Sequence, residues 1–137
     1  MAIAELIQYA EAHHSKTPDD FMHKRLVQDI SSKLVKLGIP DDAIVFSEVA
    51  QIADGRLIGA VDLMAIAEDR VYIIEAKTLD KHKARPGHTY SGIRAQLNKG
   101  YSFFSEMSEL PITCIGVYRR SRARRFHLMR HNPPLFP

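Results

Sequence analysis

The stretch that decides the fold is Ile58-Gly-Ala-Val-Asp62-Leu-Met-Ala-Ile-Ala-Glu-Asp-Arg-Val-Tyr-Ile-Ile-Glu75-Ala-Lys77. Its apolar runs at 63–67 and 71–74 predict two β-strands. The polar pair Glu68-Asp69 between them predicts a turn, and a symmetric loop over 67–70 would keep the same register. We therefore expect this segment to fold as a β-hairpin.

Three charged side chains flank the hairpin at its open end. With the turn at Glu68-Asp69, Asp62 lies directly opposite Glu75, with side-chain carbons about 5 Å apart. Lys77, two residues beyond Glu75, points to the same side. The sequence thus predicts two carboxylates and an ammonium group on one face.

Both faces of the hairpin are apolar. The face of the acids also carries Met64, Ile66, Val71 and Ile73, and the other face carries Leu63, Ala65, Tyr72 and Ile74. We expect such strands to lie in the centre of a sheet that is covered on both sides. A structural ion pair with Lys77 is the alternative explanation of the acids. Because charges at the edge of a covered layer are expensive to bury, the pattern favours a functional site.

The chemistry of this group points to a divalent cation. Two carboxylates at such a distance repel each other, and each raises the pKa of the other unless a cation lies between them. Carboxylate oxygens are hard ligands that suit Mg²⁺ or Mn²⁺. The metal can make a water nucleophilic, and Lys77 can hold an anionic reacting group. This set of groups suits phosphodiester hydrolysis.

These residues resemble the core motif of the PD-(D/E)XK nuclease superfamily, an acid followed by a hairpin and Glu-x-Lys. Gly59-Ala-Val-Asp62 stands for the first motif and Glu75-Ala-Lys77 for the second, with Val61 in place of the proline that names the family. The resemblance covers roughly Phe21 to Tyr118. It implies a restriction-endonuclease-like fold and metal-dependent cleavage of DNA, with Asp62 and Glu75 as metal ligands.

The resemblance also implies roles for residues on two helices. Nucleases of the recombination-helicase and CRISPR-associated exonuclease branch carry a glutamine and a tyrosine on the helix after Glu-x-Lys, which Gln96 and Tyr101 match in placement. Archaeal Holliday-junction resolvases resemble the segment His23-Lys-Arg-Leu-Val, with a glutamate at the place of His23. We therefore expect Gln96 to support catalysis and Tyr101 to contact nucleic acid; the alternatives are a glutamine satisfied by solvent and a tyrosine of the core. His23 is either a further metal ligand or active-site orienter, or a surface or helix-packing residue.

Glu48 is a further candidate metal ligand, because the superfamily often has another acid on the strand before Asp62. A two-residue turn at Asp54-Gly55 places Glu48 opposite Val61, on the wrong face. Only a bulge, for which Gly59 is the candidate, would bring Glu48 round to Asp62. A structural ion pair is the alternative for this residue.

The order of elements predicts an α/β protein. Helices are expected over Ala2 to His13, from a Thr17-Pro18 start to Gly38, and over Tyr90 to Met107, and strands over 43–53, 56–67, 70–77, 112–118 and 126–129. A hairpin followed by a helical crossover into another strand predicts a three-layer α/β/α sandwich around a central mixed β-sheet. The 137 residues form one domain, with its core at about 18–131.

Two basic segments are candidates for binding DNA. The first is a predicted loop that begins directly after Lys77. The second lies at the turn of the last predicted hairpin. Either segment would contact phosphates or would only form a solvated face. The candidate nucleic-acid-binding residues are Lys81, Lys83, Arg85, Arg94, Tyr101, Arg120, Arg122 and Arg124.

Composition agrees with an enzyme that acts on a polyanion. The formal net charge is +3, and no apolar stretch is long enough to cross a membrane. The single cysteine, Cys114, favours a reducing compartment, so we expect an intracellular, cytoplasmic protein. The prediction is a Mg²⁺-dependent, structure-selective DNA endonuclease of repair or recombination that acts as a homodimer. The alternatives are an exonuclease of the CRISPR-associated type, or a nucleic-acid-binding module without turnover.

Overall fold

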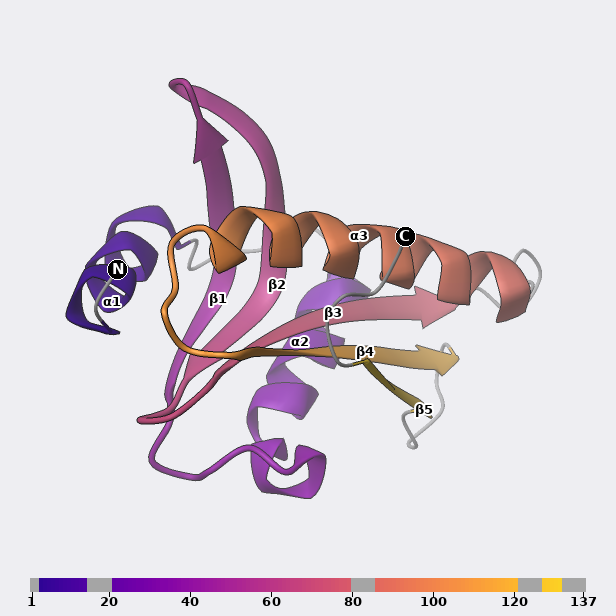
Figure 1. Ribbon diagram of the computed structural model, residues 1–137. Coiled ribbons are helices and arrows are strands. Elements are labelled where there is room, and N and C mark those ends of the chain that lie inside the picture. The colour runs from indigo at the N-terminus through magenta and orange to yellow at the C-terminus, as the bar shows by residue number, and fades with distance from the viewer. Residues whose placement is uncertain (1–2, 15–20, 80–85, 121–126, 132–137) are drawn as a thin grey trace.

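The computed structural model describes residues 3–14, 21–79, 86–120 and 127–131 (Figure 1). Helices and strands follow the predicted order. In chain order they are α1 (Ile3–His13), α2 (Phe21–Ser31), the 3₁₀ helix η1 (Leu34–Leu37), β1 (Ile44–Ala53), β2 (Arg56–Ile66), β3 (Val71–Leu79), α3 (Pro86–Ser105), β4 (Ile112–Arg120) and β5 (His127–His131).

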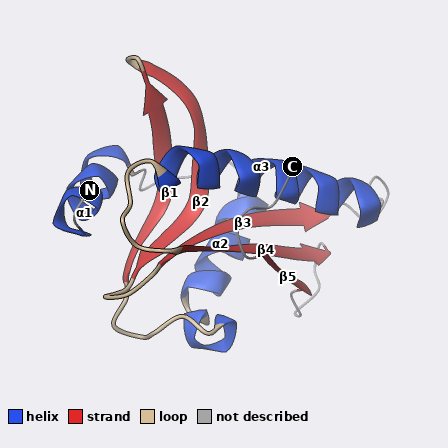
Figure 2. Ribbon diagram, in the orientation of Figure 1, coloured by secondary structure: helices blue, strands red, loops and turns tan. Residues whose placement is uncertain are grey.

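The strands form one mixed sheet in the order β1-β2-β3-β4-β5 (Figure 2). Neighbours pair antiparallel, except that β3 and β4 are parallel and are joined by the crossover helix α3. A parallel connection needs such a crossover, because the chain must return to the same end of the sheet. The α/β class and the mixed sheet are as predicted from the order of elements.

Helices cover both faces of the sheet, and each face has its own apolar cluster. Residues of α1 and α3 pack on one face, in a cluster that includes Met64, Ile66, Val71 and Ile73. Residues of α2 and η1 pack on the other face, in a cluster that includes Leu63, Ala65, Tyr72 and Ile74. The two-sided pattern read from the sequence is therefore confirmed residue by residue. Within the described ranges, no helix is long and apolar enough to cross a membrane.

The helix expected to run as far as Gly38 ends earlier, which corrects that prediction. Helix α2 stops at Ser31, and the chain continues as η1 until Gly38, which has a φ of 81°. Ser31 Oγ donates to the carbonyl of Val27, and Ser32 Oγ donates to the carbonyl of Asp29. Serine side chains that bond the preceding turn compete with regular helix, so two in succession explain the break.

The β1–β2 hairpin contains a bulge. The turn at Asp54-Gly55 has positive φ at both residues, as a two-residue type I′ turn requires. Near the turn Ile52 pairs with Leu57, but further along Gln51 pairs with Gly59, so Ile58 is an extra residue in β2. Bulges bend a strand and increase its twist. Beyond this point the hairpin projects from the body of the molecule, past α3 (Figure 1).

Candidate functional site

The two central strands separate at the predicted site. Strands β2 and β3 pair over four residue pairs only, from Ile66 with Val71 to Leu63 with Ile74. Strand β3 continues to pair with β4 as far as Leu79, whereas β2 leaves for the projecting hairpin. Asp62 is the first residue of β2 past the last pair. Its Oδ2 accepts a hydrogen bond from the backbone N–H of Ala76 at 2.6 Å, so a side chain replaces the missing strand.

Glu75 lies beside Asp62 in this separation, as the hairpin register predicted. Both carboxyl groups are buried, with Asp62 exposed by 9% and Glu75 by 5%. Burial raises the pKa of Glu75 to about 9, and the negative charge of Asp62 and a hydrogen bond to it add to the increase. The charge of Lys77 acts in the opposite direction and lowers the pKa of Glu75. The site thus disfavours the charged form of Glu75.

One atom of this pair is unsatisfied. Glu75 Oε1 is buried and has no hydrogen-bond partner in the structure. A buried polar atom without a partner costs free energy, and a cation between the carboxylates would remove both that cost and the repulsion. Among the described residues no three His, Cys, Asp or Glu side chains form a group that could hold a metal ion. Two carboxyl groups supply only part of a ligand set, and Mg²⁺ is the kind of hard cation that keeps several water ligands.

Lys77 follows Glu75 by two residues on β3, and its side chain is exposed. Its effect on the pKa of Glu75 shows that its charge reaches the carboxyl pair. An exposed ammonium next to a buried acidic pair can receive an anionic group from solvent. The role of Lys77 toward a phosphate or a water molecule stays a prediction.

Glu48 reaches the neighbourhood of Asp62 by the route that the sequence left open. The expectation that it lies opposite Val61 is wrong, because the extra residue Ile58 shifts the register by one and Val49 pairs with Val61. The Cα of Glu48 therefore lies across from that of Asp62, with an unusual φ of 51°. Since no three-residue metal group is found among the described residues, Glu48 stands beside the pair without completing a ligand set in this conformation.

Helix α3 lies directly on the strands that carry the acids. A Cβ placed on Gly100 would come within 2.9 Å of Val61 and 3.2 Å of Ile73, so only glycine permits this approach. Gln96, four residues earlier, occupies an exposed position of the preceding turn. Tyr101 is partly buried and packs against the α1/α3 cluster, and Arg94 is exposed. The structure therefore puts Gln96 on the helix that covers the site, as predicted.

Several predicted residues lie outside what the structure describes. Lys81, Lys83, Arg85, Arg122 and Arg124 belong to segments that are not described, and the same holds for the side chains of His23 and Arg120. Their proposed contacts with DNA or metal stay predictions.

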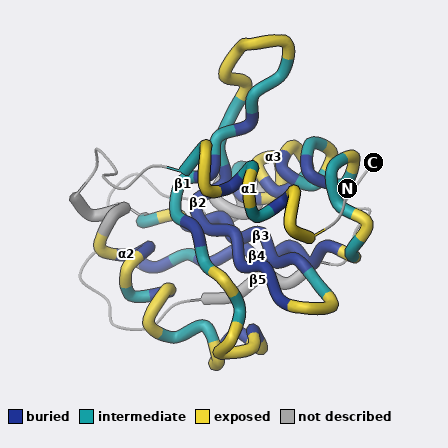
Figure 3. The backbone as a smooth tube through the Cα atoms, turned by 90° about the vertical axis from the view of Figure 1, so that its left-hand side faces the viewer, coloured by how far each residue is buried: buried dark blue, intermediate teal, exposed yellow. Residues whose placement is uncertain are grey.

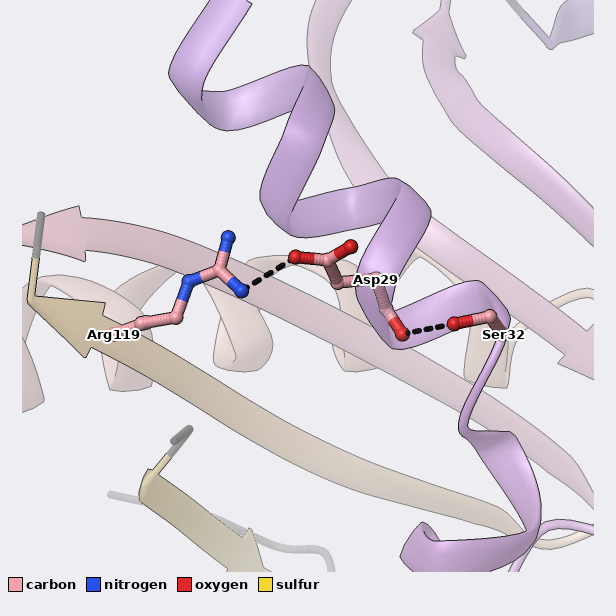
Figure 4. A network of polar contacts seen from close by, with 3 residues as sticks. All are labelled: Asp29, Ser32 and Arg119. Carbon is pink, nitrogen blue, oxygen red and sulfur yellow. Dashed lines mark hydrogen bonds and ion pairs between the residues drawn. The ribbon is translucent and has the colours of Figure 1, made fainter. Parts of the chain in front are cut away.

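Arg119 has a different role from the one its basic neighbours indicated. It adjoins the arginines that are candidates for binding DNA, but it is 8% exposed and its Nη1 lies 2.5 Å from Oδ2 of Asp29 on α2 (Figure 4). The pair ties α2 to the end of β4. Asp29 and Arg119 are 90 residues apart in the chain, so no local pattern could have revealed the contact.

Two polar residues near the site were missed from the sequence. Lys99 of α3 donates a hydrogen bond to the carbonyl of Ile58, the extra residue of the bulge. Gln51 is 1% exposed, and its Oε1 is buried without a partner in the structure. A lysine on an amphipathic helix and a glutamine in a strand carry no sequence signal of their own. Cys114 is no candidate nucleophile, because burial raises the pKa of its thiol to about 12.

Comparison with known proteins gives a fold and no family. No family profile matches the sequence, and no curated protein matches it significantly. The crystal structure of a protein designated SSO0001 superposes with a TM-score of 0.51, over 85% of this chain and 51% of that one, at 22% identity. The chain thus spans about half the length of that protein, and the likeness extends to the fold alone.

Proposed function

We propose that the protein is a metal-dependent nuclease of the PD-(D/E)XK superfamily with a restriction-endonuclease-like three-layer fold. The observation that carries the proposal is the buried pair Asp62 and Glu75 at the strand separation, with Glu75 Oε1 unsatisfied. A stable core gains nothing from two buried acids side by side, whereas a hydrolase that uses Mg²⁺ or Mn²⁺ requires them.

Each residue has a distinct role in this proposal. The side chains of Asp62 and Glu75 hold the cation, which supplies Lewis acidity and lowers the pKa of water. The ammonium group of Lys77, at the solvent side, holds the phosphate or the attacking water and favours the charge that develops in the transition state. Gln96, on α3, supports catalysis. Arg94, exposed on the same helix, contributes to binding of the nucleic-acid backbone.

The substrate proposed is DNA, cut internally at a branched or otherwise distorted structure by a homodimer in the cytoplasm. The alternatives are an exonuclease of the recombination-helicase and CRISPR-associated type, and a nucleic-acid-binding module without turnover. The unsatisfied Glu75 Oε1 argues against the binding module, because binding alone does not require a buried acidic pair.

A cleavage assay tests the proposal. Labelled single-stranded, duplex and four-way-junction DNA are incubated with the protein in Mg²⁺ or in EDTA. We expect cleavage in Mg²⁺ alone, and loss of cleavage in Asp62→Asn and Glu75→Gln. Glu68→Gln is the matched control, because Glu68 is an exposed acid in the turn of the same hairpin. Cleavage that persists in EDTA, or in both site variants, would refute the assignment.

A further inference from the structure

The end of the β1–β2 hairpin, residues 52–58, projects from the body and is here called the arm. It stands clear of the helices in two perpendicular views, and its tip is exposed (Figures 1 and 3). The side chains of Leu57 and Ile58 are exposed by 69% and 40%. Two adjacent apolar side chains exposed near the end of a projecting element are candidates for contact with a partner.

The arm is held in place at its root. Lys99 of α3 donates to the carbonyl of Ile58, so the bulge is tied to the helix that covers the site. A Cβ at Gly59 would lie 2.8 Å from Gln51 Oε1 and 3.1 Å from Lys99 Nζ, which shows how closely the three residues approach. The apolar tip therefore stands at a set position relative to the carboxyl pair.

The same strand carries both features. Leu57 precedes Asp62 by five residues on β2. At about 3.3 Å per residue this is a separation of roughly 17 Å, which equals about five steps along a DNA strand. A duplex bound at Asp62 and Glu75 would thus pass the arm within half a helical turn of the bond to be cut.

We propose that Leu57 and Ile58 form a wedge that enters a DNA duplex and unstacks one base step near the cleaved bond. This inference rests on the nuclease function proposed above and adds a means of recognising that substrate, by insertion at a weak step of a branch, fork or nick. Apolar wedges of this kind kink DNA at the cost of unstacking, which is lowest where pairing is already disturbed. A two-stranded ribbon also fits the width of the major groove.

The occupant that best fits the arm is DNA and not a second copy of the chain. Two aliphatic side chains bury on the order of 200 Å², far below the roughly 800 Å² per partner of a stable interface. Arg56 directly precedes Leu57 on the arm, and Lys99 of α3 bonds the carbonyl of Ile58; both residues are exposed. Cations beside an apolar tip suit phosphates beside a base stack.

Base unstacking can be measured without cleavage. Forked and four-way-junction DNA carrying 2-aminopurine at successive positions from the cut are bound in EDTA, and fluorescence is recorded. We expect the wild-type protein to raise fluorescence at one step, roughly five base pairs from the cut. Leu57→Ser should abolish the rise and weaken binding about tenfold or more, as expected for loss of one buried leucine contact. Leu57→Met should retain the rise.

Val35→Ser is the matched control, because Val35 is 66% exposed on η1, at the other face of the sheet. It should leave both readouts unchanged. A bound wild-type protein that raises no fluorescence, or a Leu57→Ser protein equal to wild type, would overturn the wedge. The wedge would also be overturned if the Leu57→Ser substitution converted a dimer into a monomer and left the fluorescence unchanged. Failure of the nuclease function appears separately, as absence of Mg²⁺-dependent cleavage on every DNA.

Discussion

Two sites with buried ionisable side chains lie on opposite faces of the same sheet and are built in opposite ways. On the α2 face, Arg119 pairs with Asp29, and opposite charges satisfy each other (Figure 4). At the strand separation, two acids, Asp62 and Glu75, lie side by side, and one oxygen of Glu75 has no partner in the structure. The first site holds α2 to the sheet. The second leaves a buried carboxyl oxygen unsatisfied, which is why we propose it as the functional site.

The largest effect is expected from removing the acids. Asp62→Ala and Glu75→Ala should each lower single-turnover cleavage by about a thousandfold or more, because neither carboxylate alone can hold the metal. Folding and DNA affinity should change little. Near-normal Mg²⁺-dependent cleavage by either variant would show that Asp62 and Glu75 have only a structural role, as the Arg119 pair does.

The next largest effect on cleavage is expected from removing the ammonium group of Lys77. Lys77→Met is expected to lower the cleavage rate about a hundredfold while Mg²⁺ and DNA affinities are nearly preserved, because the ammonium acts mainly in the transition state. Single-turnover cleavage beside calorimetric Mg²⁺ titration would measure both. If Lys77 only pairs with Glu75, the variant will instead lose thermal stability and cut at close to the normal rate.

The Arg119 pair should respond in stability and not in activity. Arg119→Met is expected to lower the free energy of unfolding by about 2 kcal/mol. The loss is smaller than for a fully buried pair, because the Asp29 side chain is 38% exposed. Urea unfolding and cleavage should be measured on the same preparation. A variant of full stability but impaired cleavage would place Arg119 with the DNA-binding arginines after all.

The smallest effect is expected in the pH dependence of the free energy of unfolding, where the titration of Glu75 acts by about one kcal/mol per pH unit. Its pKa is raised from 4.5 to about 9 by burial and by Asp62, so between these values the folded state holds a proton that the unfolded state releases. Without divalent cations the free energy of unfolding should therefore fall as pH rises through this window, by at most about 1.4 kcal/mol per unit. Glu75→Gln should flatten the slope, and an equal slope in this variant would locate the titration elsewhere.

Periodicity and motif spacing were enough to predict the order of elements, both faces of the central hairpin and the opposition of Asp62 and Glu75. These are local consequences of alternating apolar residues and of one short turn. The position of Glu48 could only be predicted conditionally, because one extra residue in β2 decides it. The pairing of Arg119 with Asp29 and the contact of Lys99 with Ile58 depend on tertiary packing, so no local pattern contains them.

The bond from Ala76 N–H to Asp62 Oδ2 has a consequence for how the sheet assembles. The strands of an antiparallel hairpin tend to go on pairing with distance from their turn. The apolar residues of β2 and β3 would not by themselves stop this pairing beyond Leu63 and Ile74. Asp62 ends that pairing, because its carboxylate takes the N–H that the next backbone rung would use. With an apolar β-branched residue in place of Asp62, backbone pairing of β2 with β3 would continue and would draw the hairpin arm toward β3. One aspartate thus sets the length of a strand pair and the opening where chemistry can occur.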